Sequence, residues 1–258
     1  MKPIVVFGLP FNKGKRGGIV SLHKLVKLLN EKGREAYIVG SKYDTMEGVK
    51  EASAELMLSK DFHAIYPEGY NQPQIKNKGK NFIWLLHFPK REYIGFDHWL
   101  HFEPAYAKGN SQPLKVIDID LDLYCNDNQP RKGKAHMYHK NQLARQMDAA
   151  SKDSLCLDGY EPRGEDLPAI LNSREEFMCY DHYSFNSVLA ALCGCRSIVL
   201  PIPDVPKHEY VTKRPFGEFL CYGENDTVQN QSEKAREAIL KQYEETDRQI
   251  DNLLKLLD

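Results

Sequence analysis

A polar segment that follows a run of apolar residues is the strongest candidate for chemistry in this chain. An apolar run over 176–180 gives way to a polar loop, and a helical pattern then begins and closes at Gly194. Ser184, Asn186 and Ser187 stand at the start of that pattern. Hydroxyl and amide groups at a helix start, together with its unpaired N–H groups, suit an anion such as a phosphate. An ordinary helix N-cap with no ligand is the alternative.

A second candidate is the glycine pair Gly17 and Gly18, which closes a basic loop over 12–18. The loop lies between the first predicted strand and the first predicted helix, where open parallel sheets bind ligands. Glycines at this place let backbone N–H groups approach a phosphate or a sugar. The loop matches neither the dinucleotide fingerprint nor the P-loop, so a flexible basic turn is the alternative.

Two basic residues flank a predicted strand over 135–139, with Arg131 before it and Lys140 directly after it. A nearby cation stabilises the charge that develops on a departing diphosphate. Both residues are therefore candidates for binding a leaving group, and a solvated run of charges is the alternative.

His87 is the candidate general base because it lies near the end of a predicted strand over 81–88. An imidazole titrates near neutral pH and can accept the proton of a hydroxyl, or it can contact a sugar. A structural histidine is the alternative.

The segment over 176–201 resembles the donor-binding strand, loop and helix of GT-B-type glycosyltransferases. Its second half is similar to the family's pattern E-A-x-A-C-G-x-P-V-V and reads Ala190-Ala-Leu-Cys-Gly194 followed by Ser197-Ile-Val-Leu-Pro201. The residues over 17–33 resemble the family's opening, and those over 82–89 and 219–223 resemble later segments of it. The similarity spans nearly the whole chain, and its specific part is 176–201.

The resemblance implies that the chain transfers a sugar from a nucleotide-diphosphate sugar to a hydroxyl of a glycan or glycoconjugate, without a cofactor. It places a catalytic acid at Asp181, the donor base near Tyr160 and Glu161, and the diphosphate at Tyr183, Ser184, Phe185, Asn186 and Ser187.

The sequence departs from the family at Leu189, where retaining members carry the second glutamate, which binds the donor ribose. The departure favours an inverting enzyme at least as much as a retaining one. Two alternatives remain: an epimerase or hydrolase of the same fold, and a non-catalytic relative that binds a nucleotide sugar or a partner.

Three aspartates alternate with apolar residues in and just after a predicted strand over 116–121, namely Asp118, Asp120 and Asp122. Alternation would place them on one face of the strand, and D-x-D resembles the Mn²⁺ motif of the other large glycosyltransferase fold, GT-A. Side chains two residues apart on a strand are separated by about 6–7 Å, which is too far to hold one ion unless the strand bends. We therefore expect no bound metal.

The elements that must position these residues alternate between strands and helices, which predicts an α/β fold with parallel sheets. The breaker-rich segment over 108–113 is the best linker. We therefore expect two Rossmann-like lobes facing across a cleft, an acceptor-side lobe over 1–112 and a donor lobe over 113–258, with the last helix crossing back onto the first lobe. Predicted strands cover 4–8, 36–39, 63–66, 81–88, 99–102, 116–121, 135–139, 154–157, 176–180 and 197–200, and predicted helices cover 18–32, 47–59, 141–150, 165–172, 184–193 and the residues from 231 onward.

Composition excludes several other classes of protein. The chain has 35 basic and 36 acidic residues and a net charge of −1, whereas a nucleic-acid-binding domain is basic. The longest apolar runs, over 82–86 and 198–203, are too short to span a membrane. No signal-peptide pattern precedes the first strand, and none of the six cysteines forms a C-x-x-C pair. These features predict a cytoplasmic protein with reduced thiols.

Overall fold

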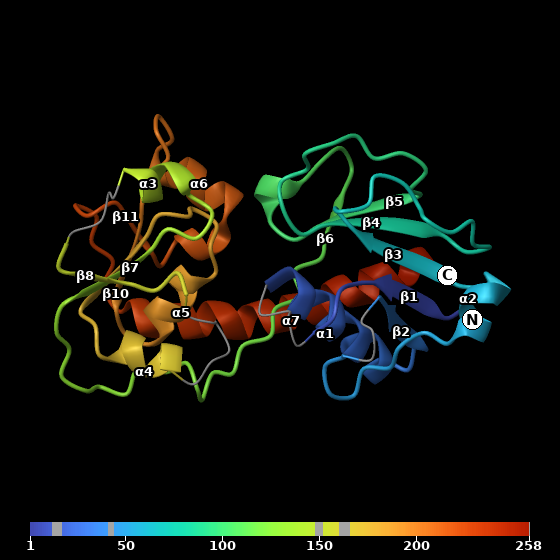
Figure 1. The fold of residues 1–258 in the computed structure, drawn as a ribbon, viewed down its shortest axis with the longest axis horizontal. Helices are drawn as coiled ribbons and strands as arrows, with labels where there is room; N and C mark the ends of the chain where they lie inside the picture. The colour runs from blue at the N-terminus through green and yellow to red at the C-terminus, as the bar shows by residue number, and fades with distance from the viewer. Residues whose placement is uncertain (12–16, 41–43, 148–151, 160–165, 258) are drawn as a thin grey trace. The chain divides into compact units, whose positions relative to one another are not determined.

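The computed structural model describes residues 1–11, 17–40, 44–147, 152–159 and 166–257. The chain divides into two compact units. Unit 1 comprises Met1–Asp118 and Gln242–Asp258, and unit 2 comprises Ile119–Lys241. Each unit has its own parallel sheet with helices packed against it, so the α/β prediction is confirmed (Figure 1).

The sheet of unit 1 is built from short strands that are rich in apolar residues. All neighbouring strands are parallel, in the order β2-β1-β3-β4-β5-β6. Parallel strands that are covered on both faces have continuous apolar sequences, and Ile4, Val5 and Val6 of the first strand are fully buried. The strands are β1 (Ile4–Phe7), β2 (Ala36–Val39), β3 (His63–Pro67), β4 (Asn81–Leu85), β5 (His98–His101) and β6 (Gln112–Pro113).

Helix α1 (Gly17–Glu31) and the second half of α7 (Gln231–Leu257) bury apolar stripes in the core of unit 1. Their apolar side chains recur at three- and four-residue steps, so they lie on one face of each helix. Leu25 of α1 and Leu253 of α7 belong to the same hydrophobic cluster as the β1 residues. The unit also contains the short helices α2 (Ala54–Ser59) and η1 (Pro104–Tyr106).

The sheet of unit 2 is also parallel, with the strand order β11-β10-β9-β7-β8. Its strands are β7 (Lys134–Met137), β8 (Ser154–Cys156), β9 (Glu176–Cys179), β10 (Arg196–Val199) and β11 (Cys221–Tyr222). Its helices are α3 (Gln142–Gln146), α4 (Asp166–Asn172), α5 (Asn186–Leu192), α6 (Lys207–Lys213) and η2 (Pro215–Gly217).

In both sheets the first strand of the unit lies between the second and the third. β1 lies between β2 and β3, and β7 lies between β8 and β9. This is the strand order of doubly wound α/β folds, in which ligands bind beyond the carboxyl ends of the strands where the order reverses. A ligand site is therefore expected at the residues that follow β1 and β3 in unit 1, and at those that follow β7 and β9 in unit 2.

The predicted strand over 116–121 is wrong. Residues 115–120 are assigned to no strand, and turns follow at 121–123. The hydroxyls of Ser21 and Thr246 donate to the carbonyl oxygens of Val116 and Lys115, at 2.7 and 2.6 Å. Because helix side chains take the hydrogen bonds that a neighbouring strand would take, the segment is not part of a sheet.

The three aspartates of this segment consequently do not line one strand face. Asp118 pairs with Lys24 at 3.2 Å. Oδ1 of Asp120 accepts hydrogen bonds from the backbone N–H groups of Asp122 and Leu123, both at 3.0 Å, and so forms a turn. Two of the three carboxylates therefore have structural partners.

Other predicted boundaries shift for local reasons. The predicted helix over 47–59 is limited to α2, since Gly48 has a left-handed φ of 80° and Ser53 caps the later helix start. The predicted linker over 108–113 ends in strand β6, so the sheet of unit 1 continues beyond residue 112. The contacts divide the chain after Asp118 and assign 242–258 to unit 1.

Among the helices that the structure describes, none is long and apolar enough to cross a membrane. All six cysteines are free, and Cys179, Cys193, Cys195 and Cys221 are buried.

Candidate functional site

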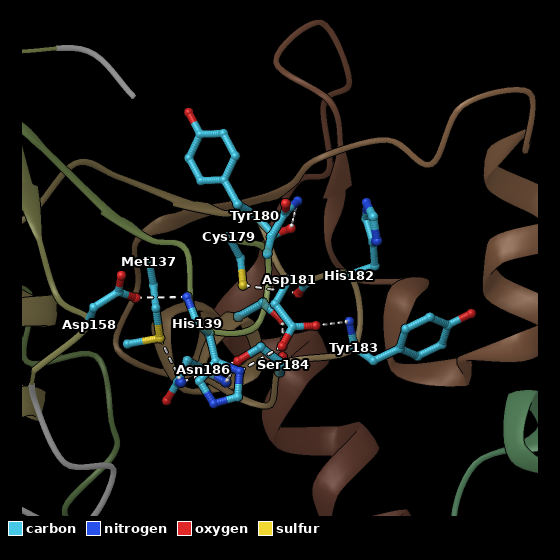
Figure 2. A network of polar contacts seen from close by, with 12 residues as sticks. Met137, His139, Asp158, Cys179, Tyr180, Asp181, His182, Tyr183, Ser184 and Asn186 are labelled. Carbon is cyan, nitrogen blue, oxygen red and sulfur yellow. Dashed lines mark hydrogen bonds and ion pairs between the residues drawn. The ribbon is translucent and has the colours of Figure 1, made fainter. Parts of the chain in front are cut away.

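The candidate site lies in unit 2, where β7 and β9 end side by side. Met137 and Cys179 are register partners at the carboxyl ends of these parallel strands. The residues that follow, 138–141 after β7 and 180–183 after β9, therefore meet at the point where the strand order reverses. Figure 2 shows the polar contacts that connect these two segments.

The central contact of the site joins His139 to Asp181. Nδ1 of His139 lies 2.6 Å from Oδ2 of Asp181, and the side chains are 43% and 13% exposed, respectively. An ionised carboxylate only accepts hydrogen bonds, so Nδ1 carries the proton. Oδ1 of Asp181 accepts a hydrogen bond from the backbone N–H of Tyr183 at 3.2 Å.

These partners hold the Asp181 carboxyl in its ionised form. Burial acts to raise its pKa, but the hydrogen bonds from His139 and from the Tyr183 backbone outweigh burial, and the charges of His139 and Lys140 act in the same direction. The pKa of Asp181 therefore lies below its ordinary value. The carboxylate is a fixed negative charge beside the imidazole.

The backbone of His139 is held in an uncommon conformation. Its φ is 47°, in the left-handed region that residues other than glycine seldom adopt. Its N–H donates to Oδ1 of Asp158 at 2.7 Å, and Nη2 of Arg145 contacts Oδ2 of Asp158 at 2.5 Å. Such a conformation costs about 1–3 kcal/mol and persists where the surroundings fix it, which is frequent at functional sites.

Asn141 connects the two segments of the site. Its Oδ1 caps helix α3 by accepting the N–H of Ala144 at 3.0 Å, and its Nδ2 donates to the carbonyl of Tyr180 at 2.9 Å. Lys140 is exposed between His139 and Asn141, and its charge helps to lower the pKa of Asp181. The sequence-predicted Lys140 and Asp181 are therefore brought together here.

The structure does not place the hydroxyls and amide at the start of α5 toward a ligand. Ser184, Asn186 and Ser187 are all buried. Oγ of Ser184 accepts the Asn186 backbone N–H at 3.3 Å, and Oγ of Ser187 donates to the Ser184 carbonyl at 2.9 Å. Nδ2 of Asn186 donates to Sδ of Met137 at 2.8 Å. The side-chain donors predicted to bind a diphosphate are therefore used within unit 2, at the start of a seven-residue helix.

A buried guanidinium lies behind this loop. Arg214 is 1% exposed; Nη1 donates to the His182 carbonyl and the Tyr210 hydroxyl, and Nη2 donates to the Ser184 carbonyl at 2.7 Å. Phe185 is packed edge-to-face against Phe216, with ring centroids 6.0 Å apart. Arg214 therefore holds the loop that carries Asp181 through the carbonyls of His182 and Ser184.

Arg131 lies at the amino ends of the strands, at the end of β7 opposite to this site. It precedes β7, and its Nη1 donates to the Asn172 carbonyl at 2.7 Å while its Nη2 donates to the Cys193 carbonyl at 2.6 Å. Asn172 ends α4 and Cys193 follows α5, and each helix leads into the amino end of the next strand. Arg131 and Lys140, both predicted to bind the donor, therefore lie at opposite ends of β7, and the structure does not bring them together.

The candidates in unit 1 are placed at the carboxyl edge of its sheet. His87 follows β4, and its ring stacks on Tyr106 with the centroids 5.6 Å apart. Gly17 and Gly18 open α1, and neither has a left-handed φ. A Cβ added at Gly17 would meet no atom of the described part of the chain within 4 Å, and one at Gly18 would meet Leu86 at 3.5 Å, which is ordinary contact. The described backbone alone therefore does not require glycine at either position.

Tyr160 and Glu161, the predicted neighbours of the donor base, lie outside the described residues.

Sequence reasoning missed His139, Asn141, Asp158 and the role of Arg145. His139 is the last residue of the predicted strand over 135–139, and Asp181 directly follows the predicted strand over 176–180. Placing these strands side by side would have paired the two residues, but a single sequence does not state which strands are neighbours.

No model of a known protein family matches the chain, and the search of curated proteins found no similar sequence.

Proposed function

We propose that this protein is a glycosyltransferase that moves a sugar from a nucleotide-diphosphate sugar onto an acceptor hydroxyl. The observation that carries the proposal is the polar cluster of His139, Lys140 and Asp181 at the point where the strand order of unit 2 reverses. This place in a doubly wound sheet is where nucleotides bind. The resemblance of 176–201 to the GT-B donor segment also supports the proposal that unit 2 binds the donor.

In this proposal unit 2 binds the donor beyond the ends of β7 and β9. The diphosphate becomes a leaving group, and its negative charge grows as the bond to the sugar breaks. A fixed cation at that position stabilises the transition state more than the ground state. Lys140 is exposed just beyond the end of β7 and is the sequence-predicted residue that fits this role.

Unit 1 is proposed to bind the acceptor at the carboxyl edge of its own sheet. His87 follows β4 at that edge and remains the proposed base for the acceptor hydroxyl. Leu189, at the position of the second glutamate of retaining relatives, is buried in unit 2. An apolar side chain in the core supplies no carboxylate to a ribose, which supports an inverting reaction.

The test of the proposal is the release of nucleoside diphosphate from UDP- and GDP-sugars, measured with and without candidate glycan acceptors. A transferase releases the nucleotide much faster when an acceptor hydroxyl is present. Acceptor-independent release would indicate the hydrolase alternative. Binding without any release would indicate the non-catalytic relative.

Replacing Lys140 with alanine is expected to lower kcat at least about tenfold, because the cation acts on charge that appears mainly in the transition state. The KM for the acceptor should change much less, since the acceptor is proposed to bind on unit 1. Steady-state kinetics separate the two effects. A variant with normal kcat would show that Lys140 is not near the leaving group.

Transfer activity is expected to survive EDTA. Asp118 is paired with Lys24 and Asp120 caps a turn, so these carboxylates have structural roles. Within the described residues, no three His, Cys, Asp or Glu side chains gather as metal ligands would. Loss of transfer on chelation, with recovery on adding Mn²⁺, would contradict this prediction.

A further inference from the structure

We infer that His139 is the residue of unit 2 that contacts the donor diphosphate, and that the protonation state of its imidazole controls donor binding. The inference rests on the proposed function and adds to it a specific ligand-binding residue and a pH dependence. It is carried by the position of the ring, by the balance of charge around it and by the conformation of its backbone.

The ring of His139 is fixed with one nitrogen available. Nδ1 is held by Asp181 at 2.6 Å, and the backbone N–H is held by Asp158 at 2.7 Å (Figure 2). Within the described part of the chain Nε2 makes no hydrogen bond, although the side chain is 43% exposed. A histidine whose orientation is set by a carboxylate on one nitrogen presents the other nitrogen to a ligand in a defined direction.

The charges around the ring depend on its protonation. The charged groups from the described elements around it include Lys140, Arg145 and the buried Arg214, all positive, and Asp158 and Asp181, both negative. Protonation of the imidazole adds one positive charge to this set and makes Nε2–H a charge-assisted donor. A diphosphate is therefore favoured by the protonated form.

The other groups predicted to bind the diphosphate are occupied elsewhere. The side chains of Ser184, Asn186 and Ser187 are buried and bonded within unit 2. Arg131 lies at the amino edge of the sheet. Nε2 of His139 lies beyond the end of β7, at the opposite end of that strand from Arg131.

The backbone conformation also indicates a role for the side chain. A left-handed histidine is uncommon, and Asp158 stabilises this one by accepting its N–H. The arrangement places an ionisable ring at the ends of β7 and β9, where a ligand of a doubly wound sheet binds. Strained residues at such positions are a feature of ligand sites.

The experiment measures the affinity of UDP- and GDP-sugars by calorimetry between about pH 5.5 and 8.5, the range over which an imidazole loses its proton. Nucleotide sugars are the probe because both phosphates are esterified, so the charge of the ligand stays constant over this range. The wild-type affinity should fall about tenfold as the pH rises, which is the effect of one lost charge-assisted hydrogen bond.

Three variants separate charge from structure. His139→Asn, which tolerates the left-handed backbone, should bind weakly at every pH, and His139→Lys should bind with little dependence on pH. His208→Gln, at an exposed histidine on α6, is the matched control and should behave as the wild type.

The inference is overturned if His139→Asn binds as tightly as the wild type with the same pH profile. It is also overturned if His139→Lys shows the same dependence on pH as the wild type. If the wild-type protein binds no nucleotide sugar at any pH, the proposed function fails, and this inference fails with it.

Discussion

Replacing Arg214 with methionine is expected to lower the free energy of unfolding of unit 2 by about 2–4 kcal/mol and to loosen the loop that carries Asp181. The guanidinium is almost fully buried and donates to two backbone carbonyls, those of His182 and Ser184. Methionine fills part of the volume but donates no hydrogen bond. Each buried acceptor that loses a charged donor costs about 1–3 kcal/mol.

Urea denaturation followed by circular dichroism measures this loss. Arg248→Met is the matched control, because Arg248 lies on the exposed side of α7 in an ion pair with Glu245 and such pairs contribute little. If Arg214→Met unfolds at the same urea concentration as the control, the hydrogen bonds from Arg214 to the His182 and Ser184 carbonyls do not stabilise the loop.

The Gly194→Ala variant is expected to be destabilised by about 2–4 kcal/mol. Gly194 has a φ of 85°, which an alanine adopts only with strain. Its added Cβ would also lie 2.6 Å from Nη2 of Arg131 and 2.8 Å from Oδ1 of Asn126. These atoms are bonded to each other at 2.7 Å, so Arg131 and Asn126 must move together to make room.

Thermal and urea unfolding of Gly194→Ala can be compared with Gly159→Ala. The Gly159 position has no left-handed φ, and no atom of the described residues lies within 4 Å of an added Cβ, so this control should unfold as the wild type does. Equal stability of the two variants would contradict the close approach of Arg131. The φ of Gly194 and the close approach of Arg131 and Asn126 would explain, without any ligand, why a glycine closes the motif over 190–194.

The sequence predicted the strands whose residues are continuously apolar. β1, β2 and β9 lie within one residue of their predicted ranges, because buried parallel strands have an unbroken apolar signal. The segment over 116–121 has the same signal but is bonded to Ser21 and Thr246. Those partners are distant in sequence, so no local pattern distinguishes this segment from a strand.

The candidate site could be predicted only in part. Lys140 was predicted because it directly follows a predicted strand, and Asp181 was predicted from the resemblance to the family's first glutamate. For Ser184, Asn186 and Ser187 the sequence shows which groups can donate, whereas the structure shows that their partners lie within unit 2. His139 could not be paired with Asp181 from the sequence, because the sequence does not show that β7 and β9 are neighbours.

The measurement that most directly tests the account is backbone hydrogen exchange, read by mass spectrometry, with and without a nucleotide sugar that calorimetry shows to bind. The account predicts slower exchange in peptides that cover 138–141 and 180–183, beyond the ends of β7 and β9. Peptides that cover 126–134, at the amino edge of the same sheet, should be unchanged. Protection around Arg131 at that edge, or no protection in unit 2 with any nucleotide sugar, would contradict the proposal that this unit binds the donor at the His139–Asp181 crevice.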